Sequence, residues 1–239
     1  MKPVAIITAT ALLLSSAALA APNIARHAEG GTNGKPINLP RLKGVPDAKV
    51  MAKVNAALAD MEKEARDGLK SCVDQLKEQK MKPTGDSFFY SFDVTYLSDH
   101  YMSVTGTSEY DCGGAHPDTD FKFVTYDLTT GAALNWDKEF KAGFTDGGDT
   151  NMSPFNKLYI ARYRLPVKKD GDECRDWVKD GTFMPDFKLD QKLGVVAVLN
   201  LPHVVAACGD DMPLTQADLK TWLKDQKLAA DLKANVKPK

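Results

Sequence analysis

The sequence predicts an α+β domain in which an antiparallel sheet packs against a long N-terminal helix and a C-terminal helix. Three observations predict it. Apolar residues between Asp47 and Lys80 recur at steps of three and four, those after residue 86 alternate with polar residues, and a helical pattern returns after residue 215. Helical and strand patterns that occur in separate runs are typical of α+β domains, whereas α/β folds alternate them.

The first part of the chain is expected to be a signal peptide, covering residues 1–20. Lys2 supplies a positive start, Val4 to Leu14 is apolar, and Ala18-Leu19-Ala20 is a small-x-small cleavage site. The apolar run is too short to span a bilayer, and no polar face in it supports the alternative of a buried N-terminal helix. The sequence therefore predicts a periplasmic or secreted protein with no membrane span after cleavage.

The composition argues against several partners and cofactors. The 239 residues carry a formal net charge of −1, which leaves no electrostatic footprint for nucleic acid or anionic lipid. The chain has no phosphate loop, dinucleotide fingerprint or Gly-x-Ser-x-Gly elbow. We therefore expect no cofactor and assign no catalytic residue. The sequence favours a protein that is not an enzyme.

The chain has four cysteines, Cys72, Cys112, Cys174 and Cys208. An even number in an exported protein indicates two disulfides, which allow three pairings. We favour Cys72–Cys112 and Cys174–Cys208, because each of these joins neighbouring segments of the chain. A zinc site is the rival interpretation, but no CxxC or HxxxH spacing supports it, and we expect no metal.

The N-terminal half is predicted to contain a leader, a helix and a sheet. Residues 21–46 are rich in Gly and Pro and are expected to form a leader segment, in which residues 37–42 add an edge strand. A single domain is expected over residues 47–235. Asp47 is the predicted N-cap of a helix that ends near Lys80. Its apolar stripe comprises Val50, Val54, Leu58, Met61, Ala65, Leu69, Val73 and Leu76.

The period then changes to two, which predicts strands. In the first strand, residues 88–96, one apolar face is expected to carry Phe88, Tyr90, Phe92, Val94 and Tyr96. Strands are also expected over residues 101–110, 121–128 and 132–136, joined by tight turns into an antiparallel meander.

The C-terminal half is predicted to return to helices and short strands. Ser153 and Pro154 have the residue types that begin a helix. Val-rich strands are expected at residues 183–189, 194–199 and 203–207. Thr215 is the predicted N-cap of one final helix over residues 216–232.

The candidate site is the loop Tyr110-Asp111-Cys112-Gly113-Gly114-Ala115-His116-Pro117-Asp118, which lies between two predicted strands. Its glycines permit positive φ and its proline favours extended geometry before it, so the loop has a defined shape. Its histidine has the chemistry of a metal ligand or a general acid–base group, beside two carboxylates, or it simply caps the turn. The candidate binding residues are Asp111, Gly113, Gly114, His116, Pro117 and Asp118.

Two other features of the sequence contain side chains that occur in functional sites. His203, in a Val-rich strand, is read as a core histidine. The acidic loop at residues 146–151 has oxygen ligands for calcium, but it lacks the spacing and the glutamate of an EF-hand.

The loop motif Tyr-x-Cys-Gly-Gly-Ala-His-Pro at residues 110–117, followed by Tyr-Asp-Leu-Thr-Thr-Gly at 126–131, resembles the extracellular domain of the lysozyme-sensing anti-sigma factor RsiV. That domain also occurs beside some peptidoglycan deacetylase domains and in exported proteins of unknown function. The resemblance covers roughly residues 86–223, and the leader and cysteine pattern depart from it.

The resemblance implies an envelope binding module rather than a catalytic centre. In the anti-sigma factor this domain recognises lysozyme, and signalling further requires a transmembrane helix and a cytoplasmic sigma-binding region, neither of which is evident in this sequence. The expected function is therefore an exported binding protein whose partner is lysozyme or another cell-wall enzyme. The alternative is an envelope hydrolase or a metal-dependent enzyme centred on His116.

Overall fold

The structure is a computed structural model that describes residues 21–30, 36–82, 88–114, 117–146, 153–163, 185–199, 209 and 211–236. Several predictions fall outside these ranges: the signal peptide, the Cys174–Cys208 bridge, the strand at 203–207, His116, and most of the acidic loop at 146–151. No helix of the described ranges is long and apolar enough to cross a membrane.

The long N-terminal helix is confirmed as α1 (Ala48–Glu78). The carboxylate of Asp47 caps it by accepting hydrogen bonds from the backbone N–H groups of Lys49 and Val50. One face of the helix is buried, and it matches most of the predicted stripe: Val50, Val54, Leu58, Met61, Ala65 and Leu76, with Cys72 beside them. Burial of this stripe, rather than helix propensity alone, stabilises so long a helix.

The main sheet is the predicted antiparallel meander, with strand order β3-β4-β5-β6. Its strands are β3 (Phe88–Leu97), β4 (Tyr101–Tyr110), β5 (Asp118–Asp127) and the short β6 (Ala132–Ala133). The last strand is shorter than expected. Asn135 ends it because its side chain accepts a hydrogen bond from the backbone N–H of Asp137 and caps a one-turn helix, α2 (Trp136–Glu139).

One side chain of β3 does not face the predicted direction. Phe88, Tyr90 and Phe92 pack toward α1, but Tyr96 is buried on the other face of the sheet. The register of β3 with β4 shifts between Val94 and Tyr96, so Thr95 is the extra residue of a β-bulge. The extra residue reverses the alternation of the strand, so the prediction that Tyr96 shares one face with Phe88, Tyr90 and Phe92 was wrong.

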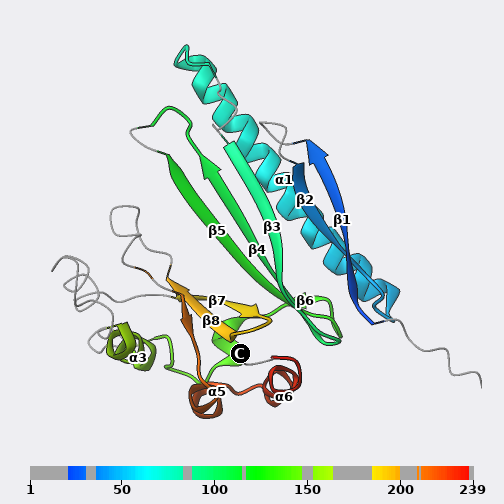
Figure 1. Ribbon diagram of the computed structural model, residues 1–239, viewed down its shortest axis with the longest axis vertical. Helices are drawn as coiled ribbons and strands as arrows, with labels where there is room; N and C mark the ends of the chain where they lie inside the picture. The colour runs from blue at the N-terminus through cyan, green and yellow to red at the C-terminus, as the bar shows by residue number, and fades with distance from the viewer. Residues whose placement is uncertain are drawn as a thin grey trace, which may run out of the picture.

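The expected leader contains a hairpin. The strand predicted at residues 37–42 is present as β2 (Pro36–Lys43), and it pairs with an unexpected strand, β1 (Asn23–Gly30). The hairpin runs beside α1 (Figure 1). The side chain of Asn55 on α1 accepts from the N–H of Leu42 at 2.8 Å and donates to its C=O at 3.0 Å, which satisfies the backbone of β2.

A second antiparallel sheet covers the opposite face of the main sheet. It contains β7 (Pro185–Asp190), β8 (Gly194–Leu199) and β9 (Met212–Pro213). The hydroxyl of Thr95 donates to the C=O of Leu189 at 2.6 Å, and the N–H of Leu189 donates to the hydroxyl of Ser103 at 3.1 Å. The bulge is therefore also the point where the two sheets are hydrogen-bonded to each other.

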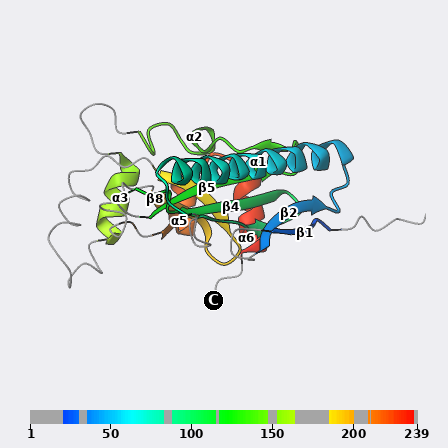
Figure 2. The same cartoon turned by 90° about the horizontal axis from the view of Figure 1, so that it is seen from above.

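The remaining helices are α3 (Pro154–Tyr163), α5 (Gln216–Trp222) and α6 (Gln226–Asn235). Ser153 and Thr215 cap α3 and α5 as predicted. The prediction of one final helix was wrong. The chain leaves helical geometry at Leu223, which forms a β-bridge with Phe140. Asp225 then caps a separate helix, α6. Seen from above, α1 lies on one side of the main sheet and α6 on the other (Figure 2).

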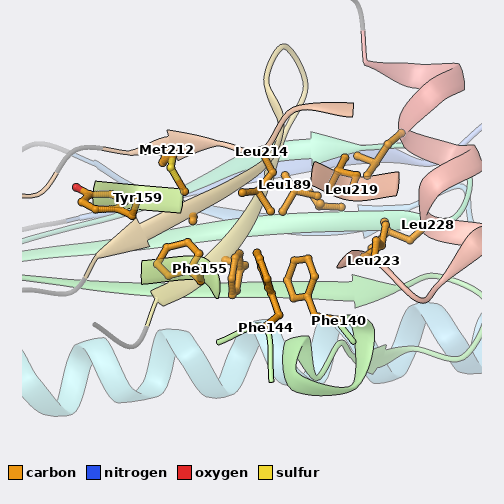
Figure 3. Packing of buried hydrophobic residues seen from close by; sticks show 14 of the residues in the cluster. Phe140, Phe144, Phe155, Tyr159, Leu189, Met212, Leu214, Leu219, Leu223 and Leu228 are labelled. Atoms are coloured by element: carbon orange, nitrogen blue, oxygen red, sulfur yellow. The ribbon is translucent and has the colours of Figure 1, made fainter. Parts of the chain in front are cut away.

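Two apolar cores result, one on each face of the main sheet. The helix core lies between α1, β2 and the sheet, and the C-terminal core lies between the sheet, β7–β9 and the shorter helices. Aromatic rings dominate the second (Figure 3): the rings of Phe140 and Phe187 lie 4.8 Å apart, and those of Phe140 and Phe144 lie 4.7 Å apart. The predicted α+β architecture is therefore present.

Candidate functional site

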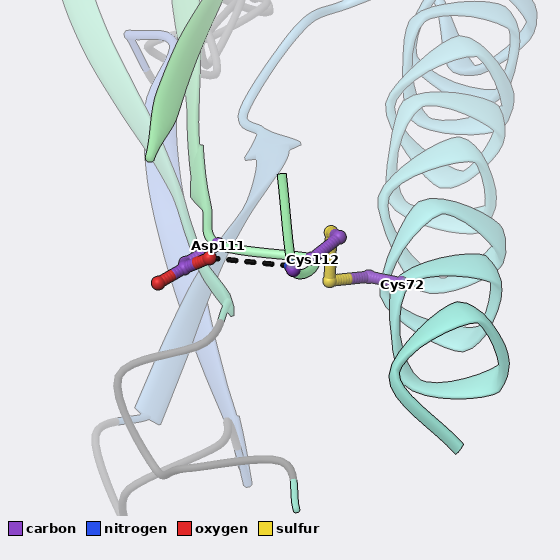
Figure 4. Close-up of a disulfide and its surroundings, with 4 residues drawn as sticks. Cys72, Asp111 and Cys112 are labelled. Carbon is purple, nitrogen blue, oxygen red and sulfur yellow. Dashed lines mark hydrogen bonds between the residues drawn. A yellow bond between two sulfur atoms is a disulfide. The ribbon is translucent and has the colours of Figure 1, made fainter. Parts of the chain in front are cut away.

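The candidate loop is covalently attached to α1. A disulfide joins Cys72 near the end of the helix to Cys112 just after β4, with Cα atoms 4.9 Å apart (Figure 4). This confirms the favoured pairing of these two cysteines. Cys72 is buried and Cys112 is partly exposed, so the bridge runs from the helix core to the base of the loop.

The conformation of the first glycine of the loop favours glycine, and its nearest neighbour is the side chain of Gln79. Gly113 has φ of +80°, and its backbone N–H donates to the carboxylate of Asp111 at 3.2 Å. A Cβ at this position would lie 2.1 Å from Oε1 of Gln79. The loop therefore lies against the side chain of Gln79 at the end of α1, and the positive φ of Gly113 is the reason that this position favours glycine.

A groove of about 770 Å³ lies beside this loop, between α1 and the main sheet. We call it the α1–sheet groove. Its wall is one face of α1, and its floor is the ends of β3, β4 and β5 nearest the loop. The lining residues are Glu64, Ala65, Gly68, Ser71, Cys72, Gln75, Phe88, Tyr90, Gly106, Ser108, Tyr110, Cys112, Gly114, Asp120, Phe121 and Lys122.

Small residues open the groove. Gly68 on α1 and Gly106 and Ser108 on β4 occupy positions where larger side chains would fill the space between helix and sheet. A Cβ on Gly106 would lie 3.0 Å from the hydroxyl oxygen of Tyr90, so the end of the tyrosine side chain packs against the glycine. Nearer the loop, the rings of Phe88 and Tyr110 stack with their centroids 6.5 Å apart.

The groove carries a mixed set of charges. Tyr90, Ser108 and Asp120 form one row across the three strands, because Tyr90 pairs with Ser108 and Ser108 with Asp120. Lys122 pairs with Gly106 in the next row and forms an ion pair with Glu64 of α1. Burial, and then the charges of Glu64 and Asp120, raise the pKa of Tyr90 to about 12. Its hydroxyl is therefore neutral at physiological pH.

The predicted site residues only partly meet in this groove. Gly114 lines it, and Gly113 shapes its end, whereas Asp111 and Pro117 are exposed. Asp118 is the first residue of β5, paired with Tyr110, and its side chain lies outside the described residues, as does His116. Within the described ranges, no three His, Cys, Asp or Glu side chains are placed to hold a metal.

Sequence reasoning missed the groove residues Glu64, Tyr90, Asp120 and Lys122. A usable signal was present for two of them. The β4–β5 hairpin is symmetric about Gly114, so counting outward from the loop places Asp120 opposite Ser108 and Lys122 opposite Gly106. Glu64 gives no such signal, because its position depends on how α1 lies across the sheet.

Comparison with known proteins identifies the fold. No protein-family model matches the sequence, and no curated protein matches it. A solved member of the DUF3298 family from Bacteroides fragilis is similar over 89% of this chain and 97% of its own, with a TM-score of 0.57 and 16% identity. A DUF3298 family protein from Pseudomonas aeruginosa is similar over 87% of this chain and 94% of its own, with a TM-score of 0.53 and 16% identity. The chain therefore has the fold of these two DUF3298 proteins.

Proposed function

We propose that the protein is an exported cell-envelope binding protein that receives a protruding segment of a peptidoglycan-active enzyme, such as lysozyme, in the α1–sheet groove. The observation that carries the proposal is the groove itself, which borders the Cys-Gly-Gly loop. Its volume, about 770 Å³, lies within the range of sites that take a ligand of several side chains' size. The resemblance of the loop motif to the lysozyme-sensing domain supports the choice of partner.

The groove is suited to binding because its parts are held in place before a partner arrives. The disulfide Cys72–Cys112 ties its wall to its floor, and the packing of Gly113 against Gln79 fixes its end. A preformed site loses less conformational entropy on binding than a mobile one, so more of the contact energy appears as affinity.

The groove residues that the structure describes favour binding over catalysis. Its two cysteines are joined in a disulfide, which leaves no thiolate nucleophile among them, and one of its carboxylates, Glu64, is paired with Lys122. The lining also carries hydroxyl, amide and aromatic groups, those of Ser71, Gln75, Phe88, Tyr90, Ser108, Tyr110 and Phe121. Such groups are suited to hydrogen bonding and packing against a protein surface.

The test is a binding assay with a groove-filling variant. We would measure binding to lysozymes, lytic transglycosylases and peptidoglycan amidases by biolayer interferometry, and inhibition by turbidity of cell-wall suspensions. Ser108→Trp places an indole in the groove and is expected to weaken binding at least ~10-fold, as for loss of a central contact. Thr107→Trp is the matched control, because the neighbouring residue of β4 faces the other side of the sheet.

Two results would contradict the proposal. One is that no enzyme of the panel is bound or inhibited. The other is that Thr107→Trp weakens binding as much as Ser108→Trp while both variants keep the wild-type melting temperature. Cleavage of wall fragments that His116→Ala abolishes without loss of stability would support the hydrolase alternative instead.

A further inference from the structure

We propose that Glu64, Tyr90 and Asp120 form a receptor for a cationic side chain of the partner, preferably arginine, and that Lys122 occupies this receptor in the free protein. The identity of the partner rests on the proposed function. The chemistry of the receptor does not, because it follows from the groove alone.

The first argument is the arrangement of the three groups. Tyr90 and Asp120 lie in one row of the sheet, separated by Ser108, and Glu64 faces them from α1 across the groove. Both carboxylates act electrostatically on the tyrosine hydroxyl. A side chain that enters between helix and sheet therefore meets acceptor oxygens on both sides.

The second argument is charge. The groove holds two carboxylates, Glu64 and Asp120, against one ammonium group, that of Lys122. Among the described residues, Lys122 pairs with Glu64, and no salt-bridge partner of Asp120 is found. The site therefore retains an excess negative charge, which a guanidinium or ammonium group complements and an anion does not.

The third argument is the aromatic lining. Phe88, Tyr90 and Tyr110 line the same groove, and the faces of aromatic rings attract cations. An arginine side chain combines a planar guanidinium, which stacks on such rings and binds carboxylates in a bidentate manner, with an apolar stem. Lysine satisfies the charge but not the planar geometry, so the receptor is expected to prefer arginine.

The fourth argument concerns the pair of Lys122 with Glu64. Both side chains are substantially exposed, at 45% for Lys122 and 63% for Glu64. An exposed pair of this kind is worth at most about 1 kcal/mol, so an entering cation displaces it at little cost. The ammonium group of Lys122 thus marks where a cation binds, and it competes with the partner's cation for the carboxylate of Glu64.

The experiment uses small peptides, so that it does not depend on finding the partner enzyme. Ac-Gly-Arg-Gly-NH2 is titrated into the 15N-labelled chain lacking residues 1–20, and backbone amide shifts are followed by NMR. The neutral isostere Ac-Gly-citrulline-Gly-NH2 is the control ligand. We expect saturable shift changes at Ser71, Gly106 and Ser108 with the arginine peptide, weakening as salt is added, and none with citrulline.

Four variants separate the receptor from general electrostatics. Asp120→Asn and Glu64→Gln are expected to remove most of the arginine-dependent shifts. Asp93→Asn is the matched control, because this exposed carboxylate lies on the opposite face of the sheet, and binding should be unchanged. Lys122→Met keeps the apolar stem without the charge and is expected to tighten arginine binding by up to about fivefold, which corresponds to about 1 kcal/mol.

The proposal is overturned if the arginine peptide gives no saturable shifts at the groove, if citrulline binds equally well, or if Lys122→Met leaves the affinity unchanged or weaker. Shifts at the same amides with N-acetylglucosamine oligomers, but not with arginine, would assign the groove to glycans. Arginine binding without any enzyme partner would contradict only the proposed function. Enzyme binding that needs an open groove but not its carboxylates would contradict only this inference.

Discussion

Cys72 of α1 and Cys112 at the start of the loop are joined by a disulfide whose Cα atoms lie 4.9 Å apart. The bridge links the wall of the α1–sheet groove to its floor at the end where the chain turns from β4 to β5. The far end of the same helix is held by Asn55 and by the apolar stripe. The helix is therefore fixed at both ends, with the groove at the bridged end.

Removal of this bridge should lower stability strongly. The two cysteines are 40 residues apart, and closure of such a loop in the unfolded chain is worth about 4 kcal/mol on the chain-entropy model. We expect Cys72→Ala with Cys112→Ala to lower the free energy of unfolding in urea by about that amount. The double variant is preferable to chemical reduction, since it leaves the other cysteines untouched. A loss below about 1 kcal/mol would show that the bridge constrains little.

Glycines at two positions should respond in opposite directions to substitution by alanine. A Cβ on Gly68 of α1 would lie 3.8 Å from the ring of Phe88, an ordinary contact, so Gly68→Ala should stabilise by about 0.5–1 kcal/mol through helix propensity. Gly131 has φ of +66°, and its Cβ would lie 3.2 Å from the C=O of Val50. Gly131→Ala should therefore destabilise by about 1 kcal/mol or more. Thermal and urea unfolding of both variants measure the difference in sign.

Alkaline pH should destabilise the protein through its buried tyrosines. Burial, followed by nearby carboxylates, raises the pKa of Tyr90 to about 12 and also raises the pKa of Tyr96 and Tyr101. The unfolded chain releases these protons near pH 10. The contribution of these tyrosines to the free energy of unfolding is therefore fully present below about pH 10, and it is lost as the pH rises through their pKa values in the folded protein.

Urea unfolding from pH 8 to 11.5, with tyrosinate absorbance at 295 nm, measures this loss and separates it from lysine titration. The slope of stability against pH should be smaller in Tyr90→Phe and smaller still when Tyr101→Phe is added. An unchanged slope in both variants would refute the assignment.

Asp218 should stabilise the protein at neutral pH and not in strong acid. Its carboxylate accepts from the backbone and hydroxyl of Thr215, each at 2.6 Å, and pairs with Arg162 of α3. Burial raises the pKa of Asp218, but the hydrogen bonds from Thr215 and Arg162 outweigh it and leave the pKa lowered. The contribution is therefore present above the unfolded pKa and is lost as pH falls through the folded one.

We expect Asp218→Asn to cost about 1 kcal/mol at pH 7 and much less at pH 2.5, as measured by urea unfolding. Asp137→Asn is the control variant, because the carboxylate of Asp137 is exposed and also lies in the first turn of a helix, α2. An equal loss at both pH values would show that the amide perturbs packing rather than charge.

The fold was predictable where one periodicity governed a long segment. The stripe of α1 repeats over 31 residues, and β4 and β5 pair without a register shift on either side of a Gly-Gly turn signal, so these elements follow from local sequence. The cap residues Asp47, Ser153 and Thr215 also acted as predicted, since capping is a local interaction.

The errors occurred where a distant contact decided the local structure. β1, which was not predicted, has a turn-like composition and is fixed by its pairing with β2. The final helix breaks because Leu223 is held by Phe140, 83 positions earlier, and no helical pattern reveals that bridge. The groove was unpredictable for the same reason, since Gly68 and Gly106 are small residues whose effect requires that α1 lie across β4.

The bulge at Thr95 gives β3 two phases within one strand. Before it, even-numbered side chains belong to the layer shared with α1; after it, Tyr96 belongs to the layer that contains α6, where its hydroxyl donates to the buried carboxylate of Asp231 at 2.6 Å. Regular pairing of the same sequence, without the bulge, would turn the ring of Tyr96 toward α1 and remove its hydrogen bond to Asp231. The count of residues in this strand, more than their polarity, assigns each side chain to its layer.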